Sequence, residues 1–124
     1  MYIAVDFDGT VVSHMYPEMG DDNPLAEEIL KQIVDNGHEL ILYTMRSEQQ
    51  LDDAIKWFQD RNIPLWDINN NKTQKFWTKS PKIYANLYID DAALGIPLIY
   101  DEKSSRDKVD WSKVKELLIK KNIL

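Results

Sequence analysis

Two acidic residues, Asp6 and Asp8, follow directly after the short apolar run of residues 2–5. Side chains two positions apart in an extended segment point the same way, so both carboxylates can converge on one site. Carboxylates that lie close together repel, and they stay ionised only where a cation or several donors compensate them. Gly9 comes next and lets the chain turn sharply. The segment therefore predicts a metal site that also presents a carboxylate nucleophile.

Two simpler explanations fit part of this pattern. An Asp-Gly pair after a strand is a common turn signal, so Asp8 and Gly9 alone would indicate a hairpin. Alternating acids also open calcium-binding EF-hand loops, but those loops need a bidentate glutamate at the twelfth position, which here is Pro17. The EF-hand is excluded, and matching groups elsewhere in the chain must separate a catalytic site from a turn.

Matching polar groups do follow two other apolar segments. Asp90 and Asp91 come directly after residues 87–89, and Thr44 ends the segment that begins at residue 39. In parallel sheets, ligands bind beyond the carboxyl ends of the strands. We therefore expect both acid pairs and Thr44 to face one crevice.

The remaining apolar segments alternate between strand-like runs and helix-like spacing of three and four residues. Pro24 opens a helix, Ser47 begins one with a capping box, and Asp110 caps a last one. Together the elements predict one domain over residues 1–124, an α/β fold with a three-layer, doubly wound, mainly parallel five-stranded sheet and helices on both faces. The five expected strands are residues 2–5, 39–44, 63–68, 87–89 and 98–100.

Composition narrows the class of protein. Apolar residues make up 44% of the 124 residues, enough for one core, and no cysteine is present to form disulfides or thiolate metal sites. The formal net charge of −6 argues against general nucleic-acid binding, although a cation in a cleft can still hold a phosphorylated ligand. No secretion signal or membrane-length apolar run is found, so we expect a cytoplasmic protein without membrane contact.

The order of these groups resembles a known family. The run Asp6-Phe7-Asp8-Gly9-Thr10, then Thr44, a lysine and the pair Asp90-Asp91 are similar to the four motifs of the haloacid dehalogenase (HAD) superfamily of phosphohydrolases and phosphotransferases. The resemblance spans roughly residues 2–100 and implies a Rossmann-like core. It also implies that Asp6 is a nucleophile that forms an aspartyl-phosphate, that Asp8 is the general acid and base, and that Thr44 holds the phosphoryl group.

Phosphoryl transfer to a carboxylate requires compensation of charge, since both reactants are anionic. Mg²⁺ suits a carboxylate-rich, cysteine-free set of oxygen ligands. We expect Asp6, the backbone oxygen of Asp8 and Asp90 to bind this metal, with Asp91 one shell further out.

The phosphate-stabilising lysine is the least defined motif. Lys82 is our choice because the last motif strand follows it directly, with Lys79 as the alternative. Taken alone, each of these lysines is more typical of a solvated surface residue, since lysine is rarely buried. Met45 and Arg46 follow Thr44 and are candidates for contact with phosphate or substrate. Arg46 fits an exposed residue beside the helix start just as well.

Superfamily members often carry an inserted cap domain. Here the two insertion points offer only residues 11–22 and 69–81, which are too short to fold alone. We therefore expect a capless form with an open crevice, favouring macromolecular phosphates or an oligomer that covers the site.

His14, Met15 and Tyr16 on the first segment are candidates for substrate contact. Residues 72–77 mix lysines with aromatic residues, which is typical either of stacking on single-stranded nucleic acid or of lid packing.

Taken together, the residues predict a magnesium-dependent phosphomonoester hydrolase acting on a small or macromolecular phosphate. One alternative is a phosphoacceptor receiver module, which also uses aspartate, threonine and lysine. In receivers the paired acids come first and the lysine last, the reverse of the order here. The other alternative is a degenerate HAD-like protein that binds magnesium or phosphate without turnover.

Overall fold

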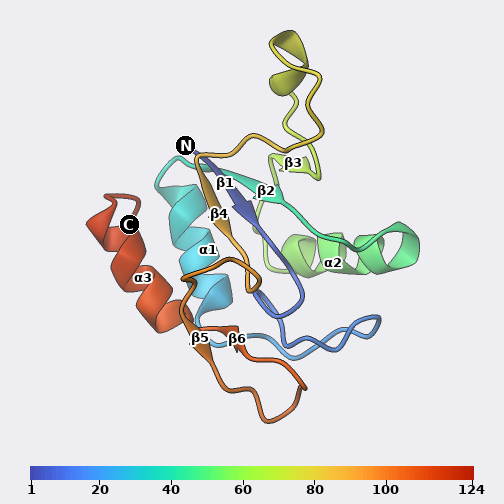
Figure 1. Cartoon of the computed structure of the whole chain (residues 1–124), viewed down its shortest axis with the longest axis vertical. Coiled ribbons are helices and arrows are strands. Elements are labelled where there is room, and N and C mark those ends of the chain that lie inside the picture. The colour runs from blue at the N-terminus through green and yellow to red at the C-terminus, as the bar shows by residue number, and fades with distance from the viewer.

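The computed structural model describes all residues from 1 to 124 and contains an α/β fold (Figure 1). Its main sheet has four parallel strands in the order β3-β2-β1-β4, consistent with a Rossmann-like arrangement. The α/β class and the parallel sheet are confirmed. The strands are β1 (Tyr2–Val5), β2 (Glu39–Leu42), β3 (Asp67–Ile68) and β4 (Leu87–Ile89).

The expected fifth strand does not join this sheet, so the five-stranded prediction was wrong. Instead β5 (Leu98–Ile99) pairs antiparallel with β6 (Lys108–Val109) in a separate two-stranded sheet. Gly95, with a φ of 90°, turns the chain between β4 and Pro97, and this turn directs β5 away from the main sheet. The small sheet nevertheless contacts the first motif, because the Val109 amide donates to the Gly9 carbonyl at 3.0 Å.

Three α-helices supply nearly half of the buried apolar cluster: α1 (Ala26–Asp35), α2 (Glu48–Asp60) and α3 (Trp111–Lys120). Their buried side chains join one apolar cluster with alternate strand residues such as Ile3, Val5 and Leu42. Side chains alternate between the two faces of a strand, so all three helices pack against one face of the sheet. None of the helices is long and apolar enough to cross a membrane.

The other face of the sheet carries no α-helix, which differs from the expected third layer. Its buried residues Ala4 and Ile41 pair in register beside Tyr88. The connection from β3 to β4 would supply a helix there, but it forms only the three-residue 3-10 helix η1 (Gln74–Phe76). That connection is rich in asparagine, lysine, serine and threonine and offers no apolar stripe for a longer helix.

Candidate active site

Three aspartates gather where β1 and β4 end. One carboxylate oxygen each from Asp6, Asp90 and Asp91 lies within 4.8 Å of the others. The Asp6 amide donates to the Ile89 carbonyl at 2.9 Å, so the pairing of β1 with β4 continues one residue into the site. The sheet itself therefore brings together acids that are 84 residues apart in sequence (90 − 6).

Thr10 and Gly9 join the two acidic segments. The Thr10 hydroxyl donates to Asp6 Oδ2 at 2.9 Å and accepts from the Asp91 amide at 3.0 Å. Gly9 has a φ of 81°, and a Cβ there would collide with the Asp91 carboxylate. The first motif thus requires glycine for two separate reasons, and its threonine aligns the acids.

Burial strongly affects the protonation of this cluster. Desolvation, with the charge of Asp90 as the second cause, raises the pKa of Asp6 to about 8. Burial also raises the pKa of Asp91. Like charges held together in a half-buried place favour either protons or a bound cation. Three carboxylates with no nitrogen or sulfur donor among them fit a hard divalent cation such as Mg²⁺.

Asp8 has a different environment, because its side chain does not join the carboxylate cluster. Arg46 Nε donates to Asp8 Oδ2 at 2.7 Å and Arg46 Nη2 donates to Asp8 Oδ1 at 2.8 Å, a bidentate ion pair. The same guanidinium donates to the backbone oxygens of Glu18 and Gln50 at 2.8 and 3.2 Å. Arg46 is only 2% exposed, so it is neither the surface residue nor the free substrate contact that its sequence position suggests.

Thr44 and Met45 lie beside these groups on the loop after β2. The Thr44 hydroxyl accepts from the Arg46 amide at 3.1 Å, and the Thr44 amide donates to Asn69 Oδ1 at 2.8 Å. Asn69, at the end of β3, thereby fixes the Thr44 backbone. Sequence reasoning missed this role, since nothing in the run Asn69-Asn70-Asn71 marks which asparagine bonds to the loop after β2. Met45 is 96% exposed at the edge of the site.

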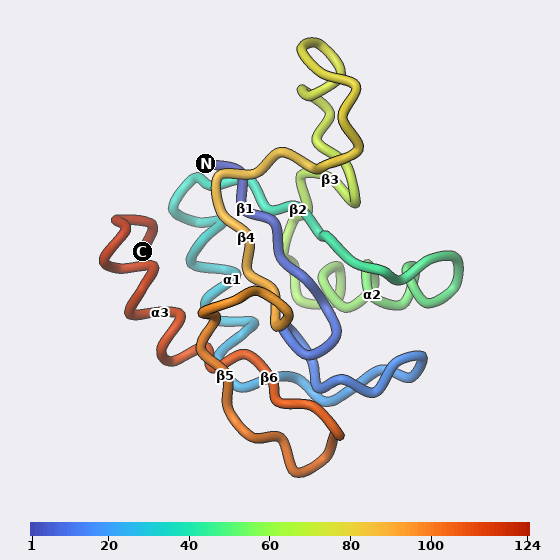
Figure 2. Tube along the Cα trace, viewed as in Figure 1, coloured from blue at the N-terminus to red at the C-terminus, as the bar shows by residue number.

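The four aspartates, Thr44, Met45 and Arg46 line one cavity of about 430 Å³. Two short segments form its rim: the flap (residues 11–22) and the rim loop (residues 100–107). Figure 2 shows both at the end of the molecule opposite η1. They contribute His14, Tyr16 and Arg106 to the cavity lining. The complete lining is Asp6, Asp8, His14, Tyr16, Thr44, Met45, Arg46, Asp90, Asp91, Ala92 and Arg106.

The structure does not bring Lys82 to this cavity. Lys82 precedes β4, so it lies towards the amino ends of the parallel strands, whereas the acids follow their carboxyl ends. It lines a separate pocket with Trp77 and Tyr84, and its ammonium lies 6.0 Å from the Tyr88 ring centroid. Neither Lys79 nor any other lysine lines the acidic cavity, whose cationic groups are Arg46 and Arg106, with His14 a further titratable side chain.

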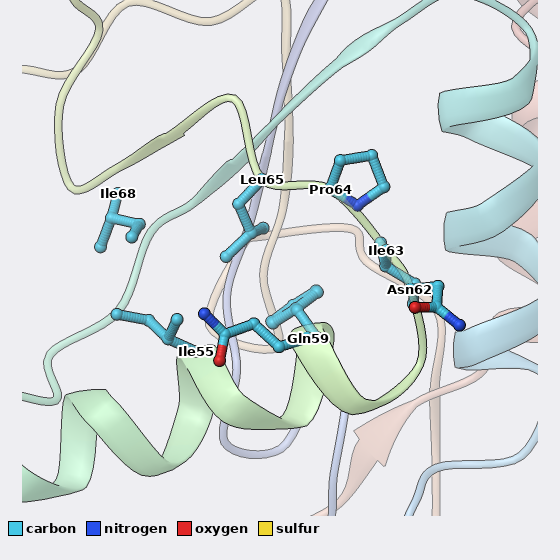
Figure 3. A pocket seen from close by; sticks show the side chains of 8 residues that line it. Ile55, Gln59, Asn62, Ile63, Pro64, Leu65 and Ile68 are labelled. Atoms are coloured by element: carbon cyan, nitrogen blue, oxygen red, sulfur yellow. The ribbon is translucent and has the colours of Figure 1, made fainter.

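A larger cavity of about 600 Å³ lies between α2 and the segment that leads into β3 (Figure 3). Ile55, Phe58, Leu65 and Ile68 contribute to its mainly apolar wall, and no residue around it is acidic or basic. It offers no group for acid, base or metal chemistry, so the acidic cavity is the candidate active site.

The fold and site define an α/β protein with a carboxylate cluster at the carboxyl end of a parallel sheet. The chain is similar to a conserved protein of Bacteroides thetaiotaomicron whose structure is known, with 37% identity over 98% of this chain and 91% of that chain and a TM-score of 0.81. It belongs to the same family as that protein. No family model matches the chain, and no curated protein is detectably similar in sequence.

Proposed function

We propose that this chain is a magnesium-dependent phosphomonoester hydrolase of the HAD superfamily. One observation carries the proposal: the two acids of the first motif occupy different environments. Asp6 lies in the three-carboxylate cluster, and Asp8 lies in a bidentate pair with Arg46. Two carboxylates with separate environments at one site are typical of a division between nucleophile and proton-transfer group.

In this proposal an Asp6 oxygen attacks phosphorus as the ester P–O bond breaks, and the leaving oxygen takes a proton from Asp8. Water then attacks the aspartyl-phosphate, Asp8 takes back a proton, and inorganic phosphate leaves with Asp6 restored. Mg²⁺ held by Asp6 and Asp90 would neutralise negative charge on the phosphoryl group, with Asp91 supporting it.

Asp8 needs freedom for these proton transfers, yet both of its oxygens accept from Arg46. Substrate binding must therefore loosen at least one of the two contacts. Thr44, which lines the cavity, would hold the phosphoryl group. No lysine lines the cavity, so the lysine that the HAD motifs provide for the phosphoryl group has no counterpart there.

Release of phosphate from an aryl phosphate, with and without Mg²⁺, tests this function. We expect metal-dependent turnover in the wild type and a fall of at least about a hundredfold in Asp6→Asn and Asp8→Asn. Full activity in Asp6→Asn would eliminate the nucleophile assignment.

A second candidate is a protein that binds magnesium and phosphate without turnover, and the missing lysine favours it. Calorimetry separates the two candidates. Magnesium and phosphate binding that depends on Asp90, without hydrolysis of any monoester in a broad panel, would establish the binding protein.

A further inference from the structure

The active-site cavity has two sides of opposite chemical character. Its floor presents the aspartates at the ends of β1 and β4, which attract a metal ion. Its rim presents His14 and Tyr16 from the flap and Arg106 from the rim loop. These three side chains can all donate hydrogen bonds, and the rim adds no acid to the cavity lining.

The rim is held in place by contacts between its two segments. Ser104 Oγ donates to the His14 carbonyl at 2.9 Å, and Lys103 Nζ lies 2.8 Å from Asp21 Oδ2. Within the flap itself, Gly20 packs so closely on the Ser13 carbonyl that a Cβ there would collide with it. The flap and the rim loop therefore form one continuous wall that keeps His14 and Arg106 beside the same cavity.

Arg106 is the cation of this wall that lacks a partner. The guanidinium groups of Arg46 and Arg61 both form ion pairs, whereas that of Arg106 forms no ion pair or hydrogen bond within the chain. An unpaired arginine at the edge of a cavity attracts an anionic group of a ligand, and its planar donors suit a carboxylate or phosphate.

We propose that the rim, through Arg106 with His14 and Tyr16, binds a second anionic group of the substrate. The inference rests on the proposed function, because the phosphoryl group of the same molecule must occupy the metal-binding floor. A cavity of about 430 Å³ is the size of a small-molecule site. The substrate class is then a small phosphate monoester that carries a carboxylate or a second phosphate, not a macromolecular phosphate.

Non-hydrolysable ligands test the rim without requiring turnover. Phosphonoacetate, phosphonopropionate and phosphonobutyrate carry a phosphonate and a carboxylate at increasing separation, and alkyl phosphonates of matched length lack the carboxylate. Calorimetry in excess Mg²⁺ should show that the best carboxylated ligand binds about tenfold more tightly than its alkyl counterpart. A bisphosphonate of the same length tests whether a second phosphate serves equally.

Arg106→Gln should abolish that tenfold preference and leave the affinity for the alkyl phosphonates unchanged. Arg106→Lys should restore part of the preference, because it keeps the charge but not the planar fork. Lys113→Gln removes one positive charge from an exposed position on α3 and is the matched control, in which the full preference should remain.

The possible results separate the two proposals. Equal affinity for carboxylated and alkyl ligands, or a preference that persists in Arg106→Gln, overturns the rim site. A preference that depends on Arg106 in a protein without any hydrolysis supports the rim site and rejects the phosphatase. Hydrolysis of monoesters with no preference for a second anion supports the phosphatase and rejects the rim site.

Discussion

At the scale of single residues, Arg46 organises the site more than any other side chain. It pairs with Asp8 and also holds the flap through the Glu18 carbonyl and the start of α2 through the Gln50 carbonyl. Its guanidinium lies 5.5 Å from the Tyr16 ring centroid, a second contact to the flap. A change at Arg46 therefore affects both the proposed proton-transfer group and the wall of the cavity.

Arg46→Lys should lower kcat by about tenfold or more, because lysine keeps the charge but cannot hold both Asp8 oxygens in one orientation. KM should change little, since the proposed substrate contacts lie on other residues. We also expect a loss of about 2 kcal/mol in the free energy of unfolding, from the unmatched buried polar groups. Steady-state kinetics and urea denaturation measure the two effects.

Arg61→Lys is the matched control for that experiment. Arg61 pairs with Asp22 and Glu27 outside the active-site cavity, so its replacement should reduce stability and leave kcat unchanged. Equal kcat values in the two variants would limit Arg46 to a structural role.

The sequence showed which residues end the motif strands, and the structure brings Asp6, Thr44, Asp90 and Asp91 to one cavity. The residues at strand ends can be predicted from the sequence, because hydrophobic periodicity shows where each strand stops. The ion pair between Arg46 and Asp8 could not be predicted, because the two residues are 38 positions apart and no local pattern indicates such a pair. The prediction of Lys82 as a site residue was wrong, because Lys82 lines a separate pocket. The position of a lysine in the order of motifs does not show at which end of the sheet it lies.

At the scale of elements, the turn after β1 is the most demanding piece of backbone. Gly9→Ala should weaken Mg²⁺ binding by at least about tenfold, since the new methyl group would displace the Asp91 carboxylate. Positive φ adds a backbone cost of about 1 kcal/mol for alanine. Calorimetric titration with Mg²⁺ and thermal unfolding report the two terms separately.

Gly37→Ala isolates the backbone term. Gly37 has a φ of 89° but nothing within 4 Å of an added Cβ. Gly37→Ala should lower the free energy of unfolding about as much as the backbone strain in Gly9→Ala does, and it should leave the Mg²⁺ affinity unchanged. An equal loss of Mg²⁺ affinity in both variants would contradict the role of Gly9.

The helix starts provide a second matched comparison. Asp110 accepts hydrogen bonds from the Ser112 and Lys113 amides, as its sequence position predicts, whereas the Ser47 side chain makes no capping hydrogen bond. Asp110→Ala should therefore lower the free energy of unfolding by about 1 kcal/mol, and Ser47→Ala should have almost no effect. Equal losses in urea denaturation would contradict the assignment of the caps.

Element prediction succeeded where apolar spacing decides the structure and failed where tertiary pairing does. β1, β2, β4 and all three helices follow from their own residues. β5 has strand-like residues, but its partner is β6, which no local pattern indicates. The capping box at Ser47 has the right residues without the hydrogen bond, so the start of α2 depends on its packing.

At the scale of the whole molecule, the carboxylate cluster links pH, metal and stability. The pKa of Asp6 is raised to about 8 in the folded chain, against about 3.8 when exposed. Because the folded chain holds the Asp6 proton more tightly than the unfolded chain, protonation of Asp6 stabilises the fold. This stabilisation is fully present below about pH 3.8 and is lost as pH rises through about 8. Asp91 shifts in the same direction. The metal-free protein should therefore lose stability at this site as pH rises from about 3.8 to about 8.

Mg²⁺ should reverse that loss, because a divalent cation replaces the proton as the partner of the cluster. Free Mg²⁺ at a hundred times its dissociation constant adds about 2.7 kcal/mol to the free energy of unfolding, and its affinity should rise as pH approaches 8. Thermal unfolding at pH 6 and pH 8.5, with Mg²⁺ or EDTA, measures this coupling. Asp6→Asn, which cannot ionise, should show a smaller pH dependence and a smaller Mg²⁺ effect, and a wild-type response in that variant would remove Asp6 from the metal site.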